Sequence, residues 1–132
     1  FEGWCVGARP QKNHDLIKPK NILEKKEDTK FLWRNKVNKE LKNEYRKIFN
    51  KIDILIFLKV PNFECVYKWR LLQEKKLQLT SRGKKIMSAF QVRKFIMYYE
   101  RITMQMLKDL TNKAYAVLYL DKKHRFSKIK FN

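Results

Sequence analysis

Residues that break or cross-link a chain are scarce in this sequence, which has three glycines, three prolines and two cysteines among 132 residues. The scarcity of glycine and proline excludes a collagen-like repeat, a flexible linker and a small loop-rich scaffold. Cys5 and Cys65 lack the CxxC spacing of redox and metal sites, so we expect two free thiols in a reducing compartment. The chain should therefore consist of long regular elements.

Long apolar runs and familiar catalytic arrays are also missing from these 132 residues. No run approaches the length of about 18 residues that a membrane-spanning helix needs, and there is no basic-then-apolar leader. His14 and His124 stand apart, and no Ser-His-Asp, paired-His or CxxC array occurs. We expect a soluble, cytoplasmic protein with one hydrophobic core.

Acidic residues are few beside the basic ones: 13 Asp and Glu stand against 32 Lys and Arg, which gives a net charge of +19. Such a charge is typical of nucleic-acid-binding proteins. The basic residues are mostly lysines, however, and they are spread over every segment. This distribution favours a solvated lysine surface that also attracts nucleotide phosphates.

The hydropathy pattern predicts alternating strands and helices. Continuous apolar runs closed by turn residues predict buried strands, and apolar residues three and four positions apart predict helices with one buried face. Asn62 and the Ser88–Gln91 pair are typical of helix starts, and residues 79–87 predict a basic mobile loop. The predicted strands span residues 1–7, 53–60, 114–120 and 125–131, and the predicted helices span residues 22–27, 32–52, 62–77 and 88–109.

This order of elements indicates an α/β fold with a mostly parallel sheet flanked by helices on both faces. Strands separated by helices require crossover connections, which place successive strands parallel. Residues 125–131 are expected to form an edge strand after a turn. Phe1 already lies in a predicted buried strand, so we expect the chain to be a fragment of a larger domain.

An acidic side chain, Glu2, stands at the tip of the first predicted strand, FEGWCVG. A buried carboxylate is costly unless a cation meets it. In a nucleotide-binding fold that cation is most often Mg²⁺, held by oxygen ligands and water beside the phosphates. A Glu2 that merely caps the following turn is the alternative, and the residues alone fit both.

Two arginines stand near or within the predicted basic loop: Arg70, in the segment WRLLQEKKL (residues 69–77), and Arg82. A guanidinium group can bind phosphate oxygens through paired hydrogen bonds. Mobile lids that bring such a group to a transferring phosphoryl group stabilise its transition state and exclude water. A solvated basic helix is the alternative, and the same pattern fits it.

Four sequence blocks occur in an order and spacing that resemble one protein family. They are FEGWCVGARP at residues 1–10, P.N.LE..ED with WR..VN..L...Y at residues 19–45, D.L..L..P.F..V..WR..QE..L at residues 53–77, and F...YERIT at residues 95–103. Through them the chain resembles the C-terminal half of the D-glycerate kinase and uridine-kinase-like group of P-loop kinases. The resemblance covers nearly the whole chain.

The resemblance implies an ATP-dependent kinase with Mg·ATP as phosphate donor and a small-molecule hydroxyl acceptor such as glycerate. It implies that residues 1–132 are the C-terminal part of a single P-loop kinase domain, with a lid region at about residues 62–88. The implied roles are catalytic and metal-binding for Glu2, catalytic and ATP-binding for Arg70, ATP-binding for Arg82 and Arg101, and acceptor-binding for Gly3, Trp4 and Arg9.

One part of such kinases does not occur in these residues: the GxxxxGK[ST] loop, whose amides, Lys and Ser or Thr hold the phosphates and Mg²⁺. No upstream acidic residue that could serve as general base occurs either. We therefore expect the N-terminal P-loop part to be missing and the 132 residues alone to be unable to transfer phosphate. The alternatives are a basic nucleic-acid-binding protein, whose binding would weaken with salt, and a non-catalytic scaffold derived from a kinase fold.

Overall fold

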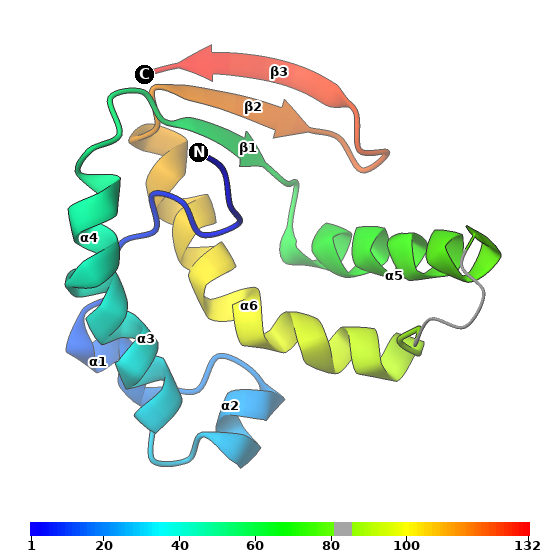
Figure 1. The fold of residues 1–132 in the computed structure, drawn as a ribbon, viewed down its shortest axis with the longest axis horizontal. Helices are drawn as coiled ribbons and strands as arrows, with labels where there is room; N and C mark the ends of the chain where they lie inside the picture. Colours follow the sequence, from blue (N-terminus) through cyan, green and yellow to red (C-terminus); the bar gives the residue numbers. More distant parts are fainter. Residues whose placement is uncertain (81–85) are drawn as a thin grey trace.

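The computed structural model describes residues 1–80 and 86–132, and it contains a sheet with helices on one side of it (Figure 1). The three strands of this sheet are β1 (Ile56–Lys59), β2 (Ala116–Leu120) and β3 (Phe126–Phe131), and they lie in that order. β1 runs parallel to β2, and β2 runs antiparallel to β3. The described sheet therefore has a parallel pair and an antiparallel edge strand.

Helices fill the segments before β1 and between β1 and β2 (Figure 1). The helix after β1 leads away from the sheet, and the next one returns to it, so the two form a projecting arm. In the described residues the helices are α1 (Asn13–Ile17), α2 (Ile22–Glu27), α3 (Leu32–Lys42), α4 (Glu44–Phe49), α5 (Phe63–Thr80), α6 (Ala89–Asp109) and the short 3₁₀ helix η1 (Leu110–Asn112).

The start of α6 confirms the predicted helix-start signal. The Ser88 hydroxyl accepts a hydrogen bond from the Gln91 backbone N–H, and the Gln91 side chain accepts one from the Ser88 N–H. This reciprocal pair satisfies two donors that a helix start would otherwise leave free. It fixes where the arm's second helix begins.

The core lies between the covered face of the sheet and helices α3 and α6. Val117 in β2 is fully buried, and it belongs to a cluster with Leu41 of α3, Met106 of α6 and Leu110 of η1. Phe57 of β1 packs against the same cluster. Burying side chains of this size stabilises the fold by about 1.5–3 kcal/mol each.

The long helix predicted over residues 32–52 is in fact two helices, α3 and α4. Asn43 separates them because its φ of −105° and ψ of −86° lie outside the helical region. The Asn43 N–H instead closes the end of α3 on the carbonyl groups of Lys39 and Glu40. Asn has a low helix propensity because its side chain competes for nearby backbone groups, which explains the break.

The strand predicted over residues 1–7 is wrong. This segment forms two turns, closed by the Val6 N–H on the Gly3 carbonyl and by the Ala8 N–H on the Cys5 carbonyl. Phe1 is 90% exposed instead of buried. A strand needs a hydrogen-bonded neighbour, and within the described part of the chain β1 pairs with β2 alone.

The predicted fold class, an α/β fold with a sheet flanked by helices, is confirmed. The sequence predicts helices on both faces of the sheet. In the described residues, helices cover one face only. On the other face, Ile56, Leu58, Ile129 and Phe131 are 59%, 55%, 56% and 67% exposed. Apolar residues on both faces of β1 are typical of a strand from the interior of a larger sheet.

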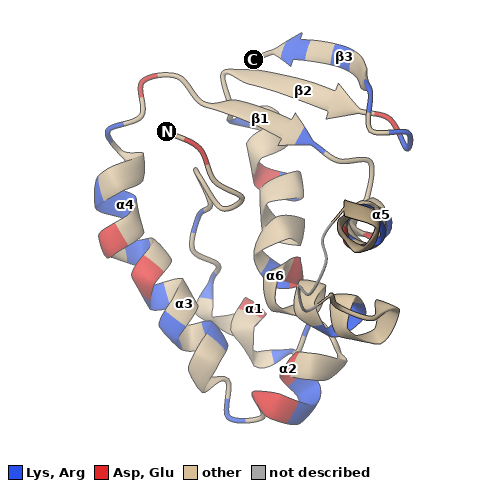
Figure 2. Ribbon diagram, turned by 45° about the vertical axis from the view of Figure 1, so that its right-hand side comes forward, with Lys and Arg blue, Asp and Glu red and all other residues tan. Residues whose placement is uncertain are grey.

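Charged side chains follow the distribution expected of a lysine surface. Lys and Arg occur on the helices, in the turns and along β3, with Asp and Glu among them on the helices (Figure 2). No helix within residues 1–80 and 86–132 is both long and apolar enough to span a membrane.

The core makes a first prediction. Leu110 is 2% exposed, so replacing it by Ala removes buried methyl groups and leaves a cavity. Leu110→Ala should lower the free energy of unfolding by about 3 kcal/mol, measured by urea unfolding followed by circular dichroism. Leu72→Ala is the matched control because Leu72 is 50% exposed, and a loss of similar size there would contradict the placement of the core.

Candidate functional site

The carboxyl ends of the parallel strands β1 and β2 are the place where α/β enzymes of this kind usually bind ligands. β1 ends at Lys59 and leads into α5, whose start is capped by Asn62: its side-chain oxygen accepts the Cys65 N–H at 3.0 Å. β2 ends at Leu120 and turns into β3. The arm made of α5 and α6 therefore extends from this end of the sheet (Figure 1).

The N-terminal turn brings three of the predicted site residues together. Glu2, Gly3 and Trp4 line one cleft, which runs beside β1. Glu2 is exposed there. Trp4 packs edge-to-face on Tyr99 of α6, with ring centroids 4.8 Å apart, and this contact ties the turn to the helix.

Arg9, predicted to face the acceptor, does not line that cleft. It is exposed, and it borders a hollow at the amino ends of β1 and β2, with Asp53 and Lys113 on the same wall. It also borders a second hollow between α3 and α6. The structure thus separates Arg9 from the other two predicted acceptor-binding residues.

Arg70 lies in the arm, where protein groups already bind it. Its guanidinium group forms an ion pair with Glu74 one turn later in α5, and it donates a hydrogen bond to Gln73. It also lies over the ring of Phe95 in α6, 5.6 Å from the centroid. Glu74 is 4% exposed and accepts the Met87 N–H, so it joins α5 to the residues just before α6.

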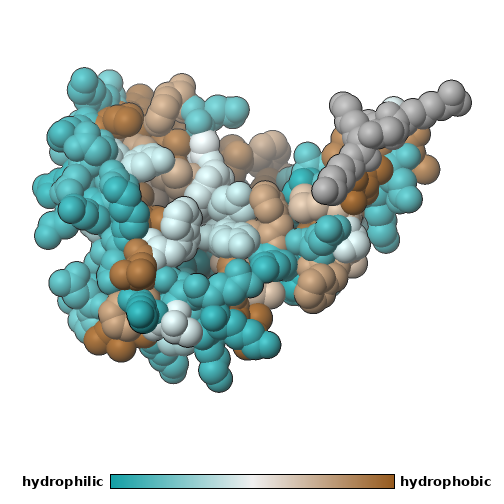
Figure 3. Space-filling view, turned by 60° about the horizontal axis from the view of Figure 1, so that its bottom comes forward, coloured by the Kyte–Doolittle hydropathy of each residue, from teal (hydrophilic) through white to brown (hydrophobic). Residues whose placement is uncertain are grey.

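Arg82, predicted to bind ATP, lies outside the described residues. The arm on either side of it leaves apolar side chains uncovered, and hydrophobic surface is visible along the arm in Figure 3. Leu79 is 87% exposed and Phe90 is 78% exposed. The arm's end is therefore not packed against the rest of the described chain.

Arg101, predicted to contact the nucleotide, is buried in α6 at 7% exposure. Its Nε and one terminal nitrogen donate to the two carboxylate oxygens of Glu24, at 2.7 and 2.6 Å. The remaining N–H groups donate to the Gln11 side chain and to the carbonyl groups of Asp15 and Lys18. An arginine has five N–H donors, and all five are occupied, so no donor is left for a nucleotide.

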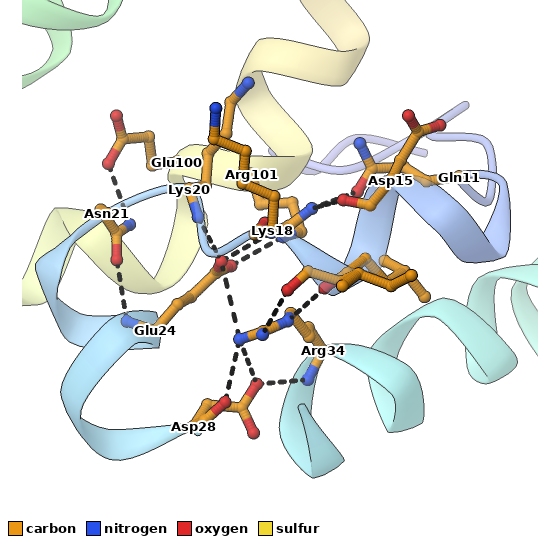
Figure 4. A network of polar contacts seen from close by, with 12 residues as sticks. Gln11, Asp15, Lys18, Lys20, Asn21, Glu24, Asp28, Arg34, Glu100 and Arg101 are labelled. Carbon is orange, nitrogen blue, oxygen red and sulfur yellow. Dashed lines mark hydrogen bonds and ion pairs between the residues drawn. The ribbon is translucent and has the colours of Figure 1, made fainter. Parts of the chain in front are cut away.

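A second buried arginine, Arg34 of α3, lies on the other side of Glu24 (Figure 4). It is 4% exposed and forms an ion pair with Asp28 at 3.2 Å. It also donates to the carbonyl groups of Leu16 and Ile17. Helix α1 and the loop before α2 thus lie between Arg34 and Arg101, which both bind their backbone carbonyl groups.

Asn21 completes this network. Its side-chain oxygen accepts the Glu24 N–H, and its amide nitrogen donates to the Met97 carbonyl and the Glu100 carboxylate. In Figure 4 the carboxylate of Glu24 lies at the centre, between α2, α3 and α6. The residues of this network belong to two of the blocks that carry the family resemblance: Asn21, Glu24, Asp28, Arg34, Glu100 and Arg101.

The charge of Glu24 is stabilised where it lies. Burial alone would raise the pKa of its carboxyl group, but hydrogen bonds from Arg101 and from the Lys20 N–H, with the charges of Arg101 and Arg34, outweigh burial. The pKa of Glu24 is therefore lowered. The carboxylate is ionised at neutral pH and compensates the two buried guanidinium groups.

Metal-binding side chains and the two thiols are further groups that can carry chemistry in the described part of the chain. No group of three or more His, Cys, Asp or Glu residues lies close enough together there to hold a metal ion. Cys5 and Cys65 are free, and burial raises the pKa of the Cys5 thiol. The Cys5 thiol is therefore protonated at neutral pH.

Sequence reasoning missed two features of this region. Glu74 stands four residues after Arg70 in the QE of the third block, and that helical spacing was the available signal for the pair. Trp69 stacks on His124 with ring centroids 4.1 Å apart, and its indole N–H donates to the Lys122 carbonyl. No pattern signals that contact because α5 and the β2–β3 turn meet only in the folded chain.

Comparisons with known proteins agree with this fold. No protein-family model matches the chain. It is 34% identical over 116 residues to "Uncharacterized kinase mug58" of the fission yeast Schizosaccharomyces pombe, a match that covers 87% of this chain and 40% of that protein.

Two solved structures have the same fold. A D-glycerate 3-kinase from Cryptococcus neoformans matches 100% of this chain with a TM-score of 0.72 and 22% identity, and 49% of that chain is covered. The YGR205w protein matches 97% of this chain with a TM-score of 0.68 and 24% identity, and 45% of that chain is covered. The resemblance to the glycerate-kinase-like family is confirmed. The chain spans about half the length, or less, of these relatives and has the fold of their C-terminal part.

The buried network makes a second prediction. Glu24→Gln removes the charge that faces two buried guanidinium groups, so it should lower the free energy of unfolding by about 3 kcal/mol at pH 7. Because the folded-state pKa of Glu24 lies below the ordinary value of 4.5, its stabilising effect is present above that pH and is lost as the pH falls further. The stability gap between wild type and variant should therefore narrow between pH 5 and pH 3 in urea unfolding experiments.

Glu64→Gln is the control for this prediction. Glu64 pairs with Arg93 on the surface, where both side chains are nearly half exposed, and such pairs contribute little. This variant should unfold at nearly the wild-type urea concentration at every pH. A gap for Glu24→Gln that stays constant with pH would contradict the role given to the Glu24 charge.

Proposed function

We propose that this chain is the C-terminal part of an ATP-dependent P-loop kinase that phosphorylates a hydroxyl group of a small molecule, with glycerate as the favoured acceptor. The observation that carries the proposal is the fold match over the entire chain to a D-glycerate 3-kinase, at a TM-score of 0.72. The identity of 34% to a second protein named as a kinase supports the same function. The free thiols agree with a reducing compartment such as the cytoplasm.

Glu2 fits one position in such an enzyme. Mg²⁺ usually keeps several waters and is bound by one or two carboxylates together with the substrate phosphates. A single exposed carboxylate beside the cleft at β1 fits that ligand set as one member of it. When bound, Mg²⁺ neutralises charge on the transferring phosphoryl group. In the proposal, Glu2 holds the hydrated ion and its waters in place.

Arg70 lies on the arm, and we assign it a role in binding ATP. In the described conformation its guanidinium group is bound by Glu74. In the proposal, Arg70 exchanges that carboxylate for a phosphate of ATP when the arm closes, and Arg82 binds a phosphate from the same arm. Arg101 has a positioning role instead, because its donors hold α1 and α2 against α6.

The acceptor would lie near the N-terminal turn. Gly3 and Trp4 line the cleft next to Glu2, so a small hydroxy acid bound there would place its hydroxyl group close to the metal. Arg9 is predicted to face the acceptor, and in the proposal it pairs with the acceptor's carboxylate. That role requires the acceptor, or the turn itself, to reach the hollow where Arg9 lies.

The proposed function is tested on the complete kinase that contains this chain, with ATP and a panel of acceptors. ADP formation should be fastest with D-glycerate, compared with nucleosides and pantothenate. Glu2→Gln should lower kcat on the order of 100-fold, as expected for a group that orients a metal and its waters, while the KM for the acceptor changes little.

Glu44→Gln is the matched control. Glu44 is an exposed glutamate on α4 that pairs with Lys47 on the surface, and it does not line the cleft at β1. Its kcat should equal that of the wild type. Equal activity of the Glu2→Gln and wild-type enzymes would exclude the metal-binding role of Glu2, and no ADP formation with any acceptor would exclude the kinase.

The 132 residues by themselves should be inactive. They contain no GxxxxGK[ST] loop to cradle the phosphates of ATP, so the purified chain should form no ADP with ATP, Mg²⁺ and D-glycerate above the rate of a protein-free control. The measurement is a coupled assay at high protein concentration. Robust turnover would show that phosphate binding is supplied by residues of this chain.

A further inference from the structure

The hollow between α3 and α6, called here the α3–α6 hollow, has mostly apolar walls. Its deeper residues come from α1, α2 and α3, and three of them, Leu16, Leu23 and Leu41, are buried. The hollow therefore reaches into the interior of this part of the chain. Its apolar walls are made of Leu16, Leu23, Val37, Leu41, Met97 and Ile102.

The α3–α6 hollow and the cleft at β1 lie on different faces of α6. Tyr99, which holds the N-terminal turn, and Met106, which lines the cleft, are seven residues apart and share one face. Tyr98, Arg101 and Gln105 line the hollow, and their spacing of three and four residues places them on another face. Because a helix has 3.6 residues per turn, Tyr98 is turned by about 100° from Tyr99. The hollow is therefore separate from the cleft proposed for the metal and the acceptor.

The volume of the α3–α6 hollow suits a single small ring. The hollow measures about 160 Å³. An engineered cavity of about 150 Å³ lined by Leu, Ile and Phe stays dry and binds benzene. Pockets for drug-sized ligands start at about 300 Å³. The hollow is thus large enough for one aromatic ring and too small for a nucleotide.

The polar side chains beside the hollow already have partners. Gln11 donates to Gln105 through its side chain, and its backbone exchanges two hydrogen bonds with the side chain of Asn38. In the part of the chain that the structure describes, no buried side-chain nitrogen or oxygen atom lacks a hydrogen-bond partner. A polar ligand would therefore lose its hydration in the hollow without gaining hydrogen bonds in return.

Two aromatic side chains stand at the mouth of the hollow. Trp33 of α3 and Tyr98 of α6 both line it, and they are 58% and 47% exposed. Aromatic side chains pack favourably against a further ring, edge to face or offset. The lining also includes Arg9 and Glu27, whose opposite charges favour neither an anion nor a cation. The mouth thus favours an uncharged ring.

We propose that the α3–α6 hollow is a binding site for one neutral, apolar ligand of about the size of an aromatic ring. Such a ligand would contact α2, α3 and α6 at once, because all three helices line the hollow. Since the hollow exists only in the folded chain, the ligand would also stabilise the fold. The proposal concerns binding alone and does not depend on the kinase reaction.

Water is a poorer occupant of this hollow. A buried water needs two to four polar partners, and the nearby side chains Gln11, Asn38 and Gln105 already use theirs on one another or on the backbone. A side chain from the part of the relatives that this chain lacks is the other alternative. A hollow filled in that way would not bind a ring in the complete protein, so the complete protein is the sample that decides.

The test is a calorimetric titration of benzene into the complete kinase that contains this chain. Benzene should bind with a Kd on the order of 1 mM, and benzoate and benzylamine should bind at least tenfold more weakly because their charges lose hydration. Nuclear Overhauser contacts should join benzene to the methyl groups of Leu23 and Val37. No benzene binding up to its solubility limit, or benzoate binding as tight as benzene, would overturn the proposal.

Val37→Phe fills the hollow with a ring of the protein itself. Val37 lines the hollow, so this variant should weaken benzene binding at least tenfold. Val66→Phe is the matched control because Val66 is a partly buried valine on α5 that does not line the hollow. The control should bind benzene within twofold of the wild type. Wild-type affinity in Val37→Phe would contradict the site.

Trp33→Ala keeps the test decisive if Val37→Phe does not fold. Trp33 is 58% exposed, so its loss leaves the core intact, and benzene binding should weaken at least threefold. Tyr45→Ala is its control, since Tyr45 is 42% exposed and lies outside the hollow. Equal affinity of the two variants would count against the site. Displacement of benzene by D-glycerate would place the acceptor in the hollow and overturn the proposal.

Discussion

The placement of the N-terminal helices α1 and α2 against α6 depends on the buried guanidinium group of Arg101. Its five donors join α6 to residues from three separate segments, and the Glu24 carboxylate at its centre is shared with Arg34. Burying two arginines is costly unless every donor finds an acceptor. The short helices α1 and α2 could not hold their positions by propensity alone, since helices of this length are unstable in isolation. The polar network, together with the buried side chains of Leu16 and Leu23, fixes them.

The sequence predicted the parts of this fold that depend on local signals. α2 spans the predicted residues 22–27, and the capping box at Ser88 sets the start of α6. The strand predicted over residues 1–7 failed because strand formation is decided by a neighbour, which hydropathy does not report. The break at Asn43 was missed because the apolar spacing continues through it while the backbone does not.

The residues of the candidate site were also predictable only where they depend on neighbours in the sequence. Residues close together in sequence, Glu2, Gly3 and Trp4, do line one cleft. Roles that depended on distant partners were less predictable: Arg101 and Arg70 carry the right chemistry for phosphate, but protein carboxylates bind both. The sequence identifies an arginine that could bind phosphate. Only the folded structure shows that its guanidinium group already pairs with a carboxylate of the protein. The family blocks therefore mark a structural network as well as a site.

The length of α6 gives this network a mechanical consequence. The helix is a single rod from Ala89 to Asp109, and Arg101 pins it twelve residues from its start. At 1.5 Å per residue, these twelve residues extend about 18 Å, and the half of them nearer Arg101 is also held by Asn21, which donates to the Met97 carbonyl. A displacement of the arm's end along this continuous helix would therefore act both on the hydrogen bonds of Asn21 and on the ion pair of Arg101 with Glu24.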